Sequence, residues 1–139
     1  MILSFYINAL DTILEQWYKM KESFLTFTWI NKNINPKFEK YLKEEFAPKR
    51  RKCPIKTKVI TSDKDRNEFR NYSTETHESI FIEKEFFDIW SEIILYWEDK
   101  IAILMYSDNN LWVVVIESKD VFNTIKSIFN LVWNLYKKK

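Results

Sequence analysis

The chain has 139 residues, of which 46% are hydrophobic, 17% aromatic and 30% charged. Apolar and aromatic side chains in this proportion exclude an intrinsically disordered segment, and the length fits a single domain, residues 1–139, with a core of its own. The 22 basic and 20 acidic residues leave a net charge of only +2. No overall field therefore draws the chain to nucleic acid or to an anionic membrane, and a basic patch has to be local.

The sequence contains a single cysteine, Cys53, so no disulfide can form within the chain. Residues 1–7 show neither a basic leader nor a small-residue cleavage site. No apolar run approaches the roughly 20 residues that a membrane-spanning helix needs. We therefore expect a reducing, cytoplasmic setting and no membrane partner.

Glycine is missing from the sequence altogether. Loops that cradle phosphate groups, of the GxxxxGK or GxGxxG kind, need glycine for tight turns and for close approach of the backbone, so nucleotide binding in these modes is excluded. Positions with positive φ are then expected at asparagine, the best of the other residues there. The asparagines at 31–35 and 109–110 are the candidates.

The first half of the chain predicts two helices and two strands. Asn8 can cap a helix that runs to about residue 21, and the residues at 23–30 alternate as in a strand. Asn35 followed by proline opens a second helix, which Pro48 is expected to end. A short strand follows at 56–61.

The second half predicts a charged, partly helical stretch at 62–71 and a strand at 79–83. Three continuous apolar runs follow, at 93–97, 101–106 and 111–116. Their short links imply antiparallel hairpins, and their lack of polar alternation implies that helices cover both faces of the sheet. The fold class is thus α/β (α+β), with a mixed, largely antiparallel sheet flanked by helices on both faces.

The last predicted helix begins at Ser118, a capping residue, and ends near residue 136. Its apolar face is wider than one contact with a sheet needs, so part of it is expected to face a partner. That face is made by Val121, Ile125, Ile128, Phe129, Val132, Trp133 and Tyr136.

The segments 116–121 and 128–133 resemble the closing helix of TrmB-type transcription regulators. Residues 97–103 are similar to that family's aromatic-Gly-Asp-Lys-Val-Ala-Ile hairpin, with Glu98 in place of the usual glycine. Residues 46–60 are similar to the family's helix exit and second strand, although Cys53-Pro54 replaces a usual glycine.

This resemblance implies a phospholipase-D-like mixed sheet used as an effector or dimerisation domain. In the family the domain normally follows an amino-terminal winged helix-turn-helix that binds DNA. The first predicted helix begins close to Met1, so we expect this chain to have no DNA-reading domain of that kind.

Ligands of open α/β sheets usually bind beyond the carboxyl ends of the strands. This placement nominates five residues as a ligand site: Thr28, Trp29, Thr61, Ser62 and Asp63. The competing interpretation is turn chemistry, because Thr-Ser-Asp is also a typical helix cap.

The strongest local charge is a basic cluster, formed by Lys49, Arg50, Arg51, Lys52, Lys56 and Lys58. These side chains are suited to nucleic acid or another phosphate, because arginine offers a planar fork to phosphate oxygens. The competing interpretation is a solvated helix exit.

No catalytic group, metal site or cofactor is predicted. A phospholipase-D-like active site needs a histidine with a lysine two residues later, whereas Ser79 follows His77 at that distance. His77 with Glu75 and Glu78 lacks further ligands for zinc, and Cys53 lacks a base. The carboxylates at 83, 85 and 88 are expected to be solvated.

The sequence therefore predicts a non-enzymatic module, similar to a regulator's effector domain, that acts by dimerisation or small-ligand binding. Its expected partner is a second copy or a related full-length regulator. The alternative is a small nucleic-acid-binding protein that uses the basic cluster at 49–58.

Overall fold

The computed structural model describes residues 2–17, 24–28, 34–53, 56–65, 77–107 and 110–137. Six strands of these residues form one sheet in the order β3-β2-β1-β4-β5-β6. The strands are β1 Phe24–Phe27, β2 Thr57–Ser62, β3 His77–Ile82, β4 Glu92–Tyr96, β5 Lys100–Ser107 and β6 Asn110–Glu117. The helices are α1 Ile2–Trp17, α2 Pro36–Tyr41, α3 Ala47–Lys52 and α5 Lys119–Lys137. A π-helical turn, η1 Leu42–Phe46, joins α2 to α3, and the 3-10 turn η2 Asp63–Asp65 follows β2.

The sheet has a parallel half and an antiparallel half that meet at β1. Strand β1 pairs in parallel with β2, which pairs in parallel with β3. On its other side β1 pairs antiparallel with β4, and β5 and β6 continue the antiparallel pattern. The predicted α/β class, with a mixed and largely antiparallel sheet, is confirmed.

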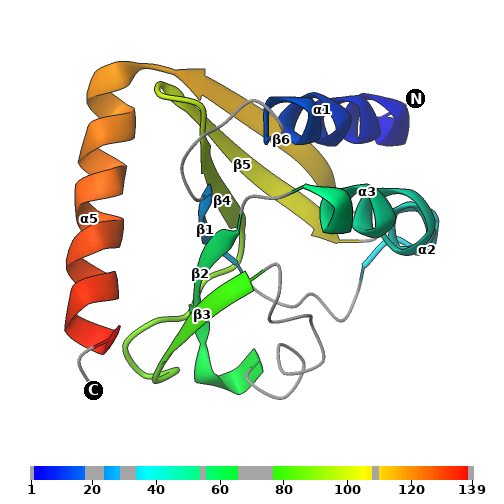
Figure 1. Ribbon diagram of the computed structural model, residues 1–139. Coiled ribbons are helices and arrows are strands. Elements are labelled where there is room, and N and C mark those ends of the chain that lie inside the picture. Colours follow the sequence, from blue (N-terminus) through cyan, green and yellow to red (C-terminus); the bar gives the residue numbers. More distant parts are fainter. Residues whose placement is uncertain are drawn as a thin grey trace.

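Helices α1, α2 and α3 lie on one face of the sheet, and α5 lies on the other (Figure 1). The first face packs Leu10 and Ile13 of α1 and Phe38 of α2 against Ile94 of β4 and Leu104 of β5. All five side chains are buried, which places an apolar core between these helices and the antiparallel strands.

Helix α5 builds the second core on the opposite face of the sheet. Phe129 and Trp133 pack there against Phe27 of β1, Ile60 of β2 and Leu95 of β4. The Phe27 and Phe129 rings meet edge to face, with centroids 5.2 Å apart. Ile94 of β4 and Ala102 of β5 belong to the first core, whereas Leu95 of β4 and Ile101 of β5 belong to the second. Helices therefore cover both faces of these two apolar runs, as the sequence predicts.

Both later helix starts are capped as predicted. The Asn35 side chain accepts hydrogen bonds from the Lys37 and Phe38 backbone N–H groups at 3.0 and 3.2 Å, with proline at the first helical position. Ser118 Oγ accepts from the Val121 N–H at 3.3 Å. Side chains that satisfy the first free N–H groups fix where a helix begins.

Pro48 does not end the second helix, contrary to the sequence prediction. The helical path continues through Lys52, because the π-helical turn η1 precedes the proline. In that turn the Ala47 N–H bonds to the Leu42 carbonyl, five residues earlier. The wider turn shifts the bonding pattern, so that Pro48 occupies the start of α3, where its missing N–H costs nothing.

The start of the first helix also differs from its prediction. Helix α1 begins at Ile2, and Asn8 lies inside it, where its carbonyl accepts from Thr12 Oγ1 at 2.9 Å. Ile7 packs with Leu10 and Leu14 in the same core, so the helical stripe extends upstream of the expected cap. Strand β1 is shorter than the predicted 23–30, of which residues 23, 29 and 30 lie outside the described residues.

Positive φ falls on a tryptophan among the described residues. Trp97, in the turn between β4 and β5, has φ of 60°. Asparagine was the expected residue for such positions, and Asn31, Asn33 and Asn109 lie outside the described residues. The turn between β4 and β5 thus holds a bulky residue in the left-handed backbone conformation, which costs roughly 1–2 kcal/mol.

None of the helices in the described part of the chain is long and apolar enough to cross a membrane.

Candidate functional site

The carboxyl ends of β1 and β2 bring two of the predicted ligand-site residues together. The Thr28 N–H donates to the Ile60 carbonyl at 3.1 Å, which places Thr28 beside Thr61. Both threonines are buried on the face opposite α5, and Thr61 Oγ1 has no hydrogen-bond partner in the described structure. A buried hydroxyl without a partner is uncommon and is a feature that a polar ligand would satisfy. Trp29 lies outside the described residues.

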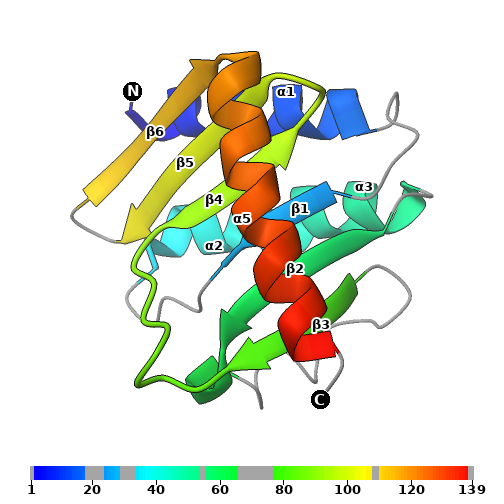
Figure 2. The same cartoon turned by 90° about the vertical axis from the view of Figure 1, so that its left-hand side faces the viewer.

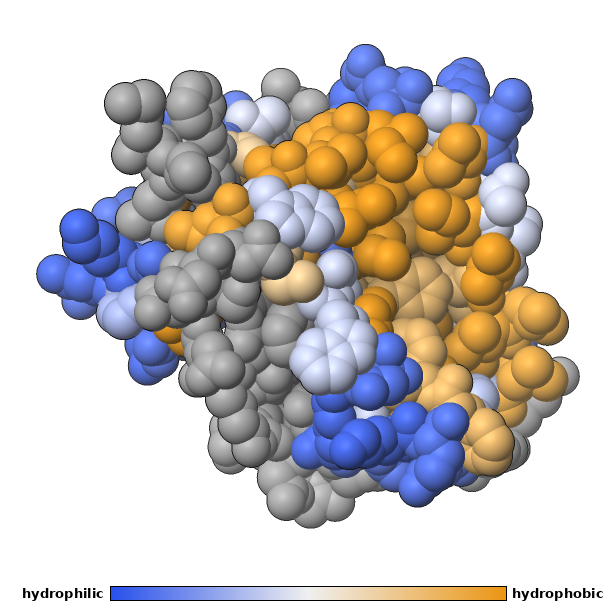
Figure 3. Space-filling view, turned by 180° about the vertical axis from the view of Figure 1, so that it is seen from behind, coloured by the Kyte–Doolittle hydropathy of each residue, from blue (hydrophilic) through white to orange (hydrophobic). Residues whose placement is uncertain are grey.

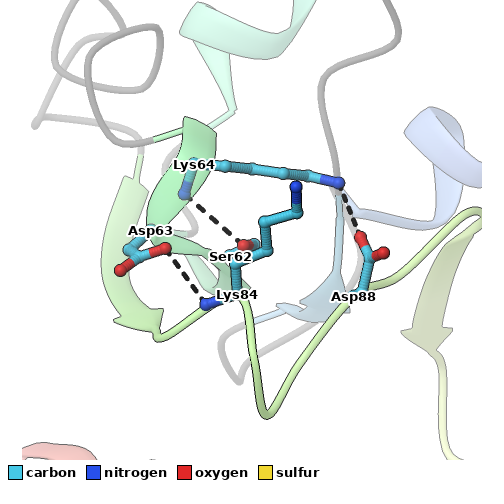
Figure 4. Close-up of polar contacts among 5 residues, drawn as sticks. All are labelled: Ser62, Asp63, Lys64, Lys84 and Asp88. Atoms are coloured by element: carbon cyan, nitrogen blue, oxygen red, sulfur yellow. Dashed lines mark hydrogen bonds and ion pairs between the residues drawn. The ribbon is translucent and has the colours of Figure 1, made fainter.

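Ser62 and Asp63 take part in a different arrangement, shown in Figure 4. The Lys64 N–H donates to Ser62 Oγ at 3.4 Å, and the Lys84 N–H donates to Asp63 Oδ1 at 3.1 Å. Lys64 Nζ lies 2.7 Å from Asp88 Oδ1. These bonds tie the turn after β2 to the connection between β3 and β4, so turn chemistry accounts for Ser62 and Asp63.

The carboxylates near this arrangement are held by other side chains. Lys64 lowers the pKa of Asp88, because its ammonium group bonds to the ionised carboxylate. The Tyr136 hydroxyl donates to Glu83 Oε2 at 3.1 Å. Asp88, with its lowered pKa, would be a poor general acid near neutral pH.

The basic cluster is divided between the two faces of the sheet. Lys58 lies on the face of α5, where its Nζ is 5.4 Å from the Trp133 ring centroid. Arg50 belongs to α3, on the opposite face of the sheet. Its side chain is only 5% exposed, and its Nη2 donates to Thr57 Oγ1 at 2.7 Å. The exposed members of the cluster are Lys49, Arg51, Lys52 and Lys56.

His77 and Glu78 are neighbours on β3, whereas Cys53 follows the end of α3. Glu78 pairs with Lys137 at 2.9 Å, and this hydrogen bond lowers the pKa of its carboxyl group. Cys53 is buried in the core beneath α1 and α2, and Glu75 lies outside the described residues. No three potential ligands among His, Cys, Asp and Glu come together in the described residues.

An apolar stripe on α5 is exposed although the helix packs on the sheet. Phe122, Phe129 and Trp133 face the core, whereas the next residues round the helix remain open to solvent. The exposed ones follow one another at spacings of 7, 3 and 4 residues, which keep them on one side of the helix as in helix–helix contacts: Val121, Ile128, Leu131 and Leu135.

The edge strand β6 extends this stripe across the sheet. Val114 pairs with Ile103, and Trp112 pairs with Met105. Ile103 belongs to the core beneath α5, so Trp112 and Val114 point to the same face of the sheet as α5. We call the exposed set the α5–β6 apolar face: Trp112, Val114, Val121, Ile128, Leu131 and Leu135, each 36–61% exposed.

Figure 3 shows this region as a broad hydrophobic area of the surface. In Figure 2, α5 crosses the sheet diagonally and leaves much of β5 and β6 beside it uncovered. The sequence predicts the wide face of the last helix. It gives no sign that Trp112 and Val114 join it, because the continuous apolar run at 111–116 predicts a strand covered on both faces, whereas these two side chains are exposed.

Comparisons with known proteins give a likeness in fold. No protein family matches the sequence, and no curated protein matches it. TrmBL2, an archaeal chromatin protein whose structure shows a novel mode of DNA binding, superimposes with a TM-score of 0.54 and 16% identity, over 92% of this chain and 47% of its own. NucT from Helicobacter pylori superimposes with a TM-score of 0.51 and 10% identity, over 90% of this chain and 87% of its own.

The chain therefore spans about half the length of TrmBL2 and most of the length of NucT. At such low identity the likeness concerns the fold alone. It supports the TrmB-related architecture that the sequence resemblance implies.

Proposed function

We propose that this chain is a non-enzymatic regulatory module, similar to the phospholipase-D-like effector domain of TrmB-type regulators. It acts in the cytoplasm by binding a second protein chain, which is a further copy of itself or a related full-length regulator. A small ligand bound at the carboxyl ends of β1 and β2 modulates this association.

The α5–β6 apolar face carries this proposal. Large apolar side chains gathered on one face, with polar residues at its margin, are typical of protein–protein contacts. The carboxylates that could act as acid or base support a role without catalysis, because Asp88 is held by Lys64 and Glu83 by Tyr136.

Sedimentation velocity at concentrations from about 1 to 100 μM tests the association, since weak specific complexes dissociate in this range. We expect the apparent mass to rise toward that of a dimer. A strict monomer at every concentration contradicts self-association. Binding of a purified TrmB-type regulator to the immobilised chain then tests the other partner.

The ligand part rests on Thr28 and Thr61, whose hydroxyls are neutral and suit a polar, uncharged ligand. Thermal unfolding with sorbitol and with inorganic phosphate as probes tests it. Because sorbitol, like other osmolytes, stabilises folded proteins in general, we expect it to raise the Tm of the wild-type protein more than that of Thr61→Val. An equal response of both proteins, or of neither, contradicts a site at Thr61.

Nucleic-acid binding is the second candidate, favoured by the exposed cations on and after α3. The resemblance in fold to TrmBL2, a chromatin protein, gives it further support. Fluorescence anisotropy with duplex DNA should show binding that weakens steeply with salt. Lys49→Gln combined with Arg51→Gln should reduce it, and Lys119→Gln on α5 serves as control. A lack of binding at low salt contradicts this function.

A further inference from the structure

The sheet is wider than the single helix that covers its α5 face. Six strands spaced about 4.8 Å apart span about 24 Å, whereas a helix with its side chains is about 10 Å across. The opposite face carries α1 together with α2 and α3, whereas α5 is the one helix of the described residues on its own face (Figure 1 and Figure 2). Beside α5 the β6 side chains Trp112 and Val114 are 36% and 47% exposed, so this edge of the face is open to a second helix.

The chemistry of the α5–β6 apolar face suits a second copy of this chain. All six of its side chains are uncharged. A two-fold contact brings a patch against its own copy, so any charge within it would meet a like charge. The stripe of Val121, Ile128 and Leu135, with Leu131 beside it, also has the spacing at which one helix packs along another.

The exposed area agrees with what a stable dimer needs. A large apolar side chain buries about 150–250 Å², so the exposed fractions of the six residues leave roughly 500 Å² of apolar surface open. A standard interface buries about 800 Å² on each partner, of which about 60% is apolar. The apolar face thus supplies the apolar part of one side of such an interface.

We infer that two copies associate through this face, and that α5 of each copy lies over the edge strand β6 of the other, where Trp112 and Val114 are exposed. The inference rests on the proposed function and names its partner and its contact. Ile128, in the middle of the stripe, is then close to Ile128 of the partner subunit. Leu131 and Trp112 become buried on association.

Leu131→Glu tests the contact, because Leu131 is 61% exposed and its replacement leaves the core of the monomer intact. We expect the dimer dissociation constant to rise at least 100-fold, since the two-fold contact loses two leucines and gains two buried charges. The matched control is Asn130→Glu, on the polar side of the same helix, which should change the constant less than about threefold. Circular dichroism verifies that both variants keep the fold.

A cysteine at the centre of the stripe gives a second measurement. Oxidation should join Ile128→Cys chains into disulfide-linked dimers, whereas Asn130→Cys chains should not be cross-linked. Cys53 is buried and takes no part. A wild-type dimer that Leu131→Glu does not weaken, or that Ile128→Cys does not cross-link, overturns this contact and leaves the proposed function standing. A wild-type monomer at 100 μM overturns both this contact and self-association.

Discussion

Arg50 Nη2 donates a 2.7 Å hydrogen bond to Thr57 Oγ1, and both residues are buried. The bond joins the end of α3 to the start of β2. A cation from the basic cluster therefore stabilises the fold, and its neighbours Arg51 and Lys52 remain exposed. Adjacent arginines with opposite surroundings allow a direct comparison.

We expect Arg50→Ala to lower the free energy of unfolding by about 2–3 kcal/mol, because a buried hydrogen bond to a charged group is lost. Arg51→Ala should change it by less than about 0.5 kcal/mol, as exposed substitutions usually do. Urea unfolding measures both. Equal losses in the two variants would contradict a structural role for Arg50.

Tyr41 links α2 to α1 through a 2.6 Å hydrogen bond that its hydroxyl donates to Asp11 Oδ1. Tyr41→Phe should therefore cost about 1 kcal/mol at neutral pH, since the bond is lost. Thermal unfolding at pH 7 measures this change. A variant as stable as the wild type would mean that water replaces the bond without cost.

The same bond predicts a loss of stability at alkaline pH. Burial, followed by the bond to Asp11, raises the pKa of Tyr41 well above its usual value. Above about pH 10 the unfolded chain loses the tyrosine proton while the folded chain keeps it, so the free energy of unfolding falls as pH rises. Tyr41→Phe should show a shallower decline between pH 9.5 and 11. Parallel declines would exclude Tyr41 as a source, and leave Tyr96, whose pKa burial also raises.

Phe129 and Ile128 are neighbours in α5 with opposite exposure, 0% and 52%. Phe129→Ala should lower the free energy of unfolding by about 3–5 kcal/mol, because it opens a cavity under the helix. Ile128→Ala, measured at a concentration where the chain is monomeric, should cost less than about 1 kcal/mol. A large loss from Ile128→Ala in the monomer would mean that the stripe is already covered within one chain.

Asn35 accepts hydrogen bonds from two backbone N–H groups at the start of α2. Replacing it with alanine should cost about 1 kcal/mol, the usual value for a lost cap. Asn35→Ser should recover most of this loss, because serine also caps well. Guanidinium unfolding of both variants separates the cap from a general effect of the substitution.

The sequence predicts most of the fold, because its signals are local. Asn35 with Pro36 and Ser118 mark helix starts through hydrogen bonds that involve only the next few residues. The hairpins of β4, β5 and β6 follow from apolar runs with short links. The prediction that Pro48 ends the second helix is wrong, because a π-helical turn before the proline lets the helix continue. No local sequence pattern indicates this turn.

The sites are harder to predict, because they depend on which face each residue takes. Thr28 and Thr61 meet as the rule on strand ends predicts, whereas Lys58 and Arg50 separate to opposite faces of the sheet. Their closeness in sequence conceals this separation. Trp112 and Val114 join the stripe of α5 only through the position of β6 at the sheet edge.

The strand order has a consequence for the time course of folding. The hairpins β4–β5 and β5–β6 close short loops, whereas the four-residue strand β1 is placed between strands remote in sequence and pairs Leu25 with Leu95. Closing long loops costs entropy before any contact repays it, so these pairs form late. The antiparallel half should therefore be organised in the transition state, and β1 should lock the two halves of the sheet together after the barrier has been crossed.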